Sequence, residues 1–125
     1  LGANQLLPEH ATQPYIKLAL PLDKSLLETP RERYVLPASV TLNLLTSHAL
    51  KFGNKGWEVF TGIPATLGGA IFMNAGTALG EIGELVEKVW VIGKDGNERE
   101  VGIGPGSFSY RAHHFLKVEN LWIVF

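Results

Sequence analysis

The spacing of apolar residues predicts short strands followed by a helix in the first half of the chain. Residues 15–20, YIKLAL, alternate in the manner of a strand, and residues 33–38, RYVLPA, form a second short apolar run. From Val40 to Phe52 the apolar residues recur every three or four positions, which predicts a helix that ends at Gly53. Its apolar stripe consists of Leu42, Leu45, Ala49 and Phe52.

The second half of the chain has the pattern of a small antiparallel sheet. Val89 and Val91 alternate with Trp90 and Ile92, which is typical of a strand covered on both faces, and Asp95-Gly96 is a signal for a two-residue hairpin turn. An irregular segment that opens with glycine, residues 104–115, precedes a last strand at 121–125. The pattern predicts an α+β fold in which a small, mostly antiparallel sheet has helices on one side.

Composition restricts the function more than the fold. A chain of 125 residues is expected to form one compact domain. The net charge of -1 gives no reason to expect a nucleic-acid partner, and the absence of cysteine excludes disulfides and cysteine-ligated zinc. No apolar run approaches the roughly 18 residues of a membrane span. Because the sequence starts at Leu1 and stops within the apolar run 121–125, we expect a piece of a longer protein.

The stretch TGIPATLGGAIFMNAG, residues 61–76, is the first candidate site, although it contains no acid, base, cysteine or histidine. Pro64 suits the first turn of a helix, which would leave unpaired N–H groups at residues 65–67 and add the hydroxyl of Thr66. Gly68 and Gly69 lack Cβ atoms, so a bulky ligand or a neighbouring strand can approach the backbone. The stretch therefore predicts either a pyrophosphate site made of backbone amides or a buried helix with a turn at each end.

The end of this stretch and the segment SFSYRAHHF complete the candidate chemistry. Asn74, Ala75 and Gly76 are typical of a helix exit in which Gly76 takes positive φ. In the second segment, Arg111 follows Tyr110 and could bind an anion or stabilise a developing enolate; the alternative is an ordinary surface arginine.

The four histidines do not predict a metal site. His113 and His114 are adjacent, so an extended segment would direct them to opposite faces, while His10 and His48 stand alone without ligand spacing. We therefore expect no bound metal.

These two candidate segments, in this order, resemble the UDP-N-acetylenolpyruvoylglucosamine reductases, the flavoenzymes that complete UDP-N-acetylmuramate in bacterial cell-wall synthesis. The resemblance runs from GWEVFTGIPATLGGAIFMNAG through FSYRAHHF and the terminal apolar strand. It covers residues 34–125 well and residues 1–20 less closely. A proline followed by a Gly-Gly helix that exits in Asn-Ala-Gly, with Tyr-Arg some 35 residues later, is a specific combination.

The resemblance implies a fold and a cofactor. Residues 31–125 would be the second subdomain of an FAD-binding domain of the vanillyl-alcohol-oxidase type, and residues 1–30 a remnant of the first subdomain with its linker. FAD would lie between the two subdomains, NADPH would be the co-substrate, and the substrate would be a nucleotide sugar in the cytoplasm. The implied cofactor-binding residues are Gly62, Ile63, Pro64, Ala65, Thr66, Gly68, Gly69, Asn74, Ala75, Gly76, Gly80, Glu81 and Ile82. Arg111 would be catalytic, stabilising the enolic intermediate, with Tyr110 as its structural neighbour.

The chain also departs from the family pattern. The family usually has glycine at the position of Ala65, Tyr-Gly in place of Ala78-Leu79, and His-Ser in place of Ala112-His113. The serine that protonates the enol and a catalytic glutamate have no counterpart here, so this chain alone is not expected to catalyse the reaction of the family. The alternatives are a truncated relative that serves as a non-catalytic binding module, or another flavoprotein oxidase of the same superfamily.

Overall fold

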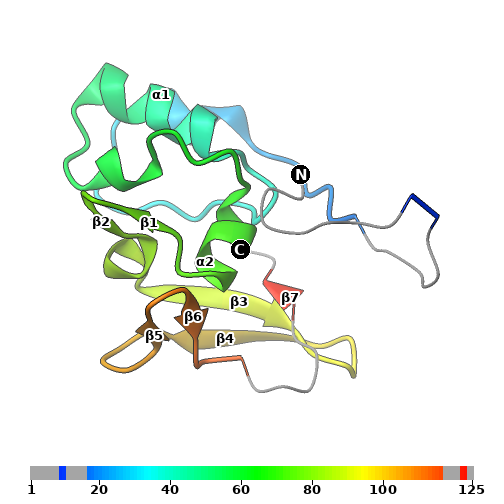
Figure 1. The fold of residues 1–125 in the computed structure, drawn as a ribbon. Coiled ribbons are helices and arrows are strands. Elements are labelled where there is room, and N and C mark those ends of the chain that lie inside the picture. Colours follow the sequence, from blue (N-terminus) through cyan, green and yellow to red (C-terminus); the bar gives the residue numbers. More distant parts are fainter. Residues whose placement is uncertain (1–8, 11–16, 117–121, 124–125) are drawn as a thin grey trace.

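The computed structural model describes residues 9–10, 17–116 and 122–123, and this part of the chain has the predicted α+β character. Figure 1 shows both α-helices above a three-stranded antiparallel sheet, with two shorter hairpins beside it. The helical elements are η1 (Lys24–Leu27), α1 (Leu42–Phe52), η2 (Trp57–Phe60), α2 (Leu67–Phe72) and η3 (Ile82–Leu85), the η elements being 3₁₀ turns. The strands are β1 (Gly76–Thr77), β2 (Gly80–Glu81), β3 (Lys88–Ile92), β4 (Glu98–Gly102), β5 (Phe108–Ser109), β6 (Ala112–His113) and β7 (Trp122–Ile123).

Helix α1 confirms the predicted apolar period. Leu42 and Leu45 are buried, and Gly53 ends the helix in the left-handed region at φ 70°, where its N–H donates to the Ala49 carbonyl over 2.7 Å. The helix begins two residues later than predicted, because the backbone at Thr41 is engaged in a bridge with Thr66. That bridge joins the beginnings of the two α-helices.

Strand β3 is the centre of the three-stranded sheet, whose order is β4-β3-β7. Val89 and Val91 are fully buried in the apolar core, and Val91 pairs with Ile123 of β7. Trp90 and Ile92 are only half-buried, so the other face of the strand is covered less completely than the alternation predicts. Within the described residues the predicted last strand is confirmed at Trp122–Ile123.

The β3–β4 hairpin is confirmed, but its turn is longer than two residues. The Gly93 N–H donates to the Asn97 carbonyl over 3.1 Å, which leaves three residues in the loop, with Gly96 at φ 76°. This is the arrangement in which a left-handed residue follows an ordinary turn. The backbone amide of Asn97 also donates to Asp95 Oδ1 and lowers the pKa of that carboxyl below its ordinary value.

The two predicted N-terminal strands are not confirmed. Residues 15–16 lie outside the described part, and residues 17–20 form no strand. Residues 33–37 form an extended segment without a ladder, which ends in a turn where the Val40 N–H donates to the Pro37 carbonyl over 3.0 Å. Pro37 has no N–H to donate, and the carbonyl of Ala38 accepts from Gly68 instead of from a strand. The burial of Leu36 and Ala38 explains the apolar run, since both belong to the core.

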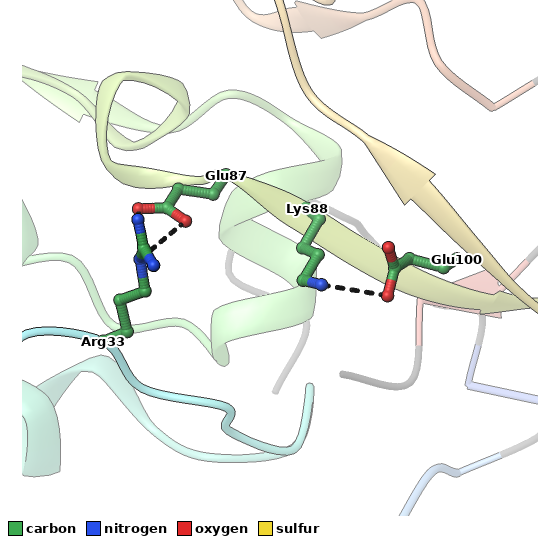
Figure 2. Close-up of polar contacts among 4 residues, drawn as sticks. All are labelled: Arg33, Glu87, Lys88 and Glu100. Atoms are coloured by element: carbon green, nitrogen blue, oxygen red, sulfur yellow. Dashed lines mark hydrogen bonds and ion pairs between the residues drawn. The ribbon is translucent and has the colours of Figure 1, made fainter.

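Side chains attach this extended segment to the rest of the molecule. Figure 2 shows the ion pair between Arg33 of this segment and Glu87, at 3.1 Å. It also shows a pair within the sheet, between Lys88 of β3 and Glu100 of β4, at 3.0 Å. Both pairs are largely exposed, so they contribute little stability. In the described part of the chain, no helix is long and apolar enough to cross a membrane.

Candidate functional site

The glycine-rich stretch forms helix α2, but the helix starts later than expected. Its N-cap is Thr66, whose hydroxyl accepts from the Gly69 N–H at 3.4 Å, and its first residue is Leu67. Pro64 therefore stands before the helix and does not open it. The Ala65 N–H is not free either, because it donates to the Ile63 carbonyl over 2.9 Å.

The amides of Leu67 and Gly68 are occupied by carbonyl groups of residues 38–40. The Leu67 N–H donates to the Val40 carbonyl and the Gly68 N–H to the Ala38 carbonyl, each over 2.8 Å. A Cβ atom on Gly68 would lie 2.6 Å from the Cβ of Ala38. The glycine is thus needed for close packing of α2 on the extended segment, so the buried-helix alternative describes Gly68 correctly.

A second set of residues in this stretch remains accessible. Gly62 and Gly69 are exposed, and Thr66 is half-buried with its hydroxyl at the start of the helix. Within the described residues, no protein group accepts from the N–H of Gly62 or of Thr66. These groups form the accessible donors of the first candidate segment.

Asn74, at the exit of α2, is a buried polar residue. Its φ is 42°, so the left-handed residue predicted at Gly76 is Asn74 instead. Its side-chain Nδ2 donates to Glu81 Oε2 at 2.6 Å and to the Ser109 carbonyl at 3.0 Å, while its Oδ1 accepts from the Gly83 N–H at 3.1 Å.

The loop after Asn74 is a short hairpin. Gly76 pairs with Glu81 and Thr77 with Gly80, and a Cβ on Gly76 would lie 2.5 Å from the Gly80 carbonyl oxygen. Ala75 and Ile82 are buried and are joined by a backbone hydrogen bond of 2.9 Å, so they belong to the core. Glu81 begins the η3 turn through a capping box with Glu84.

Arg111 lies at the tip of the β5–β6 hairpin. Its φ is 55°, its Nη2 donates to the Gly76 carbonyl at 3.2 Å, and its guanidinium lies 5.6 Å from the centre of the Tyr110 ring. Arg111 itself is exposed, and 81% of Tyr110 is accessible. A permanently charged group is therefore held beside the loop that follows α2.

The two adjacent histidines bond to different segments. His113 Nδ1 is 2.6 Å from the Phe72 carbonyl, so it donates to the C-terminal end of α2. His114 Nε2 is 2.8 Å from Ser109 Oγ in the same hairpin. In the part of the chain that the structure describes, no three His, Asp or Glu side chains are grouped closely enough to hold a metal.

The structure therefore brings the second half of the first segment together with the second segment. Asn74 and Gly76 bond to the Arg111 hairpin, and Glu81 bonds to Asn74. No interaction among the described residues joins Gly62 or Thr66 to that hairpin. Sequence reasoning missed Gly83, where a Cβ would lie 2.6 Å from the Phe108 ring. Its only signal was a glycine within an otherwise helical turn.

Two hollows lie on the surface, the second of them beside the candidate site. The first has a volume of about 210 Å³, and its lining includes the Arg33–Glu87 ion pair and aromatic side chains such as Trp57. Of the predicted cofactor-binding residues, only Ile82 lines it. A more open groove of about 350 Å³ runs past Asn74, Glu81 and Phe108. Neither one includes Arg111.

Comparison with known proteins relates the chain to one class of enzyme, a reductase. No protein-family model matches it. A protein from Carboxydothermus hydrogenoformans is 40% identical over 87 residues, covering 70% of this chain and 28% of that protein, and one from Caldanaerobacter subterraneus is 32% identical over 123 residues, covering 98% and 39%. A crystal structure from Thermus caldophilus matches with a TM-score of 0.65 and 33% identity, covering 78% of this chain and 36% of that one.

The first two proteins are named UDP-N-acetylenolpyruvoylglucosamine reductase, and the crystal structure is that of a UDP-N-acetylenolpyruvylglucosamine reductase. The resemblance inferred from the motifs is therefore confirmed, and so is the α+β fold. The chain is a homologue of one part of these reductases, and it spans between 28% and 39% of the length of the curated relatives given above.

Proposed function

We propose that this chain is the FAD-binding portion of an NADPH-dependent reductase that converts UDP-N-acetylglucosamine enolpyruvate to UDP-N-acetylmuramate in peptidoglycan precursor synthesis. Similarity to reductases of this name, in sequence and in fold, supports the proposal. Residues 31–125 would be the second FAD-binding subdomain, residues 1–30 the remnant of the first, and the enzyme would act in the cytoplasm on a nucleotide sugar.

The observation that carries this proposal is the bond between Arg111 and Gly76. The two residues are 35 positions apart, and Nη2 lies 3.2 Å from the Gly76 carbonyl oxygen. The arginine implied to be catalytic thus lies against the loop implied to close beside the cofactor. A positive charge already fixed in place stabilises negative charge that develops during a reaction without reorganising at that moment.

The accessible residues fit a flavin nucleotide in part. Gly62 and Thr66 have backbone donors without protein partners among the described residues, which suits phosphate oxygens. Gly69 is exposed and has no Cβ, so a ligand can approach the backbone there, although its N–H already donates to the Thr66 hydroxyl. Ile63, Pro64 and Ala65 would form the adjoining wall, while Asn74, Ala75, Gly76, Gly80, Glu81 and Ile82 would shape the closing loop through their backbone. Gly68 would contribute by packing, since its amide is already bonded. Bound FAD would supply the hydride transfer, and NADPH would replenish it.

Titration of the purified chain with FAD tests the proposal. We expect flavin absorption bands and quenched flavin fluorescence at micromolar concentrations. Thr66→Val removes the hydroxyl and keeps the backbone N–H. It is expected to weaken binding by about 10- to 150-fold if that hydroxyl bonds to a phosphate, since one hydrogen bond to a charged group contributes roughly 1.5–3 kcal/mol. Arg33→Ala is the control, since it removes an exposed side chain outside the implied cofactor-binding residues. A chain that remains colourless at every FAD concentration would instead support the non-catalytic binding module.

The role of Arg111 is tested in the full-length protein that contains these residues. Arg111→Ala should lower kcat by about 10²–10³, as does the loss of other groups that stabilise a developing anion, and change FAD affinity by no more than about threefold. Equal losses of both would contradict a role in stabilising the enolate.

A further inference from the structure

Asn74 has a set of contacts that its place in the motif does not explain. None of its surface is accessible, and its φ of 42° is unusual for a residue other than glycine. Both N–H groups of the amide are used, toward Glu81 and the Ser109 carbonyl, and its oxygen accepts from Gly83. A side chain buried and bonded in this way cannot reach a ligand.

Two of these bonds reach the 76–83 loop, at Glu81 and Gly83, and the third reaches the hairpin that carries Arg111, at the Ser109 carbonyl. Ser109 precedes Arg111 by two residues in the hairpin, and Gly76 follows Asn74 by two residues in the loop. Arg111 bonds back to the Gly76 carbonyl, so the contacts form a closed ring of Asn74, Ser109, Arg111 and Gly76. A shift of Asn74 would therefore move both the hairpin and the carbonyl on which the guanidinium rests.

The chemistry of this position requires an amide. Aspartate has no N–H to donate and would place a carboxylate at the 2.6 Å contact with Glu81. Gly83 matches the same arrangement, because a Cβ there would lie 2.8 Å from Asn74 Oδ1 and 2.6 Å from the Phe108 ring. The space around the Asn74 amide is closed by the β5 strand on one side and the η3 turn on the other.

We infer that Asn74 is a positioning residue for Arg111: its side-chain amide bonds the 76–83 loop to the 108–113 hairpin and so sets where the guanidinium lies. The inference rests on the proposed function only for the catalytic role of Arg111. The bonding itself is a property of the ligand-free chain and is tested there.

Hydrogen exchange of the ligand-free chain tests the bonding directly. In Asn74→Asp, the amides of residues 108–113 should exchange at least about tenfold faster, because that variant loses the bond to Ser109 and repels Glu81. The buried β3 amides, Val89 and Val91, should keep their rates. Asn43→Asp is the matched control, since it makes the same change at an exposed position in the first turn of α1.

A second substitution, at Glu81, separates the effect of the Asn74 bonds to the loop from the effect of its bond to the hairpin. In Asn74→Asp with Glu81→Gln, the new glutamine donates to the new carboxylate, and Gly83 still has its acceptor, but the Ser109 carbonyl still lacks a donor. Exchange in residues 80–84 should return to within about threefold of the original rate while the hairpin remains fast. This double variant gives the same test if Asn74→Asp alone does not fold. A hairpin with unchanged rates, or β3 rates that rise as much as those of the hairpin, would overturn the inference.

Turnover of the full-length enzyme gives an independent test. Asn74→Asp should lower kcat, and it should add little to the loss of kcat already caused by Arg111→Ala. Fully additive losses would contradict positioning through Arg111. Failure of the original chain to bind FAD would count against the proposed function alone, since the exchange measurement uses no FAD.

Discussion

Two adjacent glycines in helix α2 have different surroundings, although their sequence context is nearly the same. Gly68 is buried, and its missing Cβ leaves room for Ala38. Gly69 is exposed, and a Cβ there would approach only the hydroxyl of Thr66, at 3.3 Å. The first glycine is required by packing, whereas the second leaves the backbone open to solvent or a ligand.

Alanine at each position separates these roles. Gly68→Ala should lower the free energy of unfolding by about 1–3 kcal/mol, because the methyl group overlaps Ala38 and the two segments must move apart. Gly69→Ala should leave stability unchanged or raise it by up to about 1 kcal/mol, since alanine favours helix. Urea unfolding of both variants measures the difference. Equal stabilities would contradict the packing role of Gly68.

At the scale of elements, a buried histidine attaches the N-terminal segment to helix α1. His48 Nδ1 lies 2.9 Å from the Leu27 carbonyl, so it carries the proton and donates there. Its Nε2 then accepts from the Tyr34 hydroxyl at 2.8 Å, and the same hydroxyl accepts from the Arg31 N–H at 2.8 Å. The rings of Tyr34 and Trp57 pack edge to face beside it.

Removing the Tyr34 hydroxyl should therefore weaken this attachment. Tyr34→Phe leaves the buried His48 Nε2 without its donor, and we expect the free energy of unfolding to fall by about 1–3 kcal/mol. Tyr110→Phe is the control, because Tyr110 is mostly exposed and the change there should stay within about 0.5 kcal/mol. Urea titrations of the two variants provide the comparison, and a Tyr34→Phe protein as stable as the control would contradict the role given to the hydroxyl.

The elements that sequence predicted well are those whose period is imposed by one continuous buried face. The helix around Leu45 and the strand around Val91 are of this kind. The extended segment at Leu36 was mistaken for a strand, because burial alone does not show that its backbone bonds go to Gly68. Likewise, the motif identified Arg111 and Asn74 but not the Ser109 carbonyl between them, since a backbone partner leaves no mark on residue type.

At the scale of the whole molecule, the described part of the chain has one continuous apolar core. It extends from Leu36 in the extended segment through Leu45 of α1 and Ile82 of η3 to Val91 and Ile123 of the sheet. Leu26 and Leu27 of η1 pack on the same core, although they precede the boundary proposed at residues 30 and 31. The helical half and the sheet therefore depend on each other for burial.

A shared core predicts a single unfolding transition. In a urea titration followed by amide NMR signals, the native peaks of Leu45 in α1 and Val91 in β3 should disappear with the same midpoint, because neither element retains its buried face without the other. Gly68→Ala should lower both midpoints together, since α2 lies between the two halves of that core. Two separate midpoints, or a variant that shifts Leu45 and leaves Val91 unchanged, would mean that the helical half and the sheet are separate folding units.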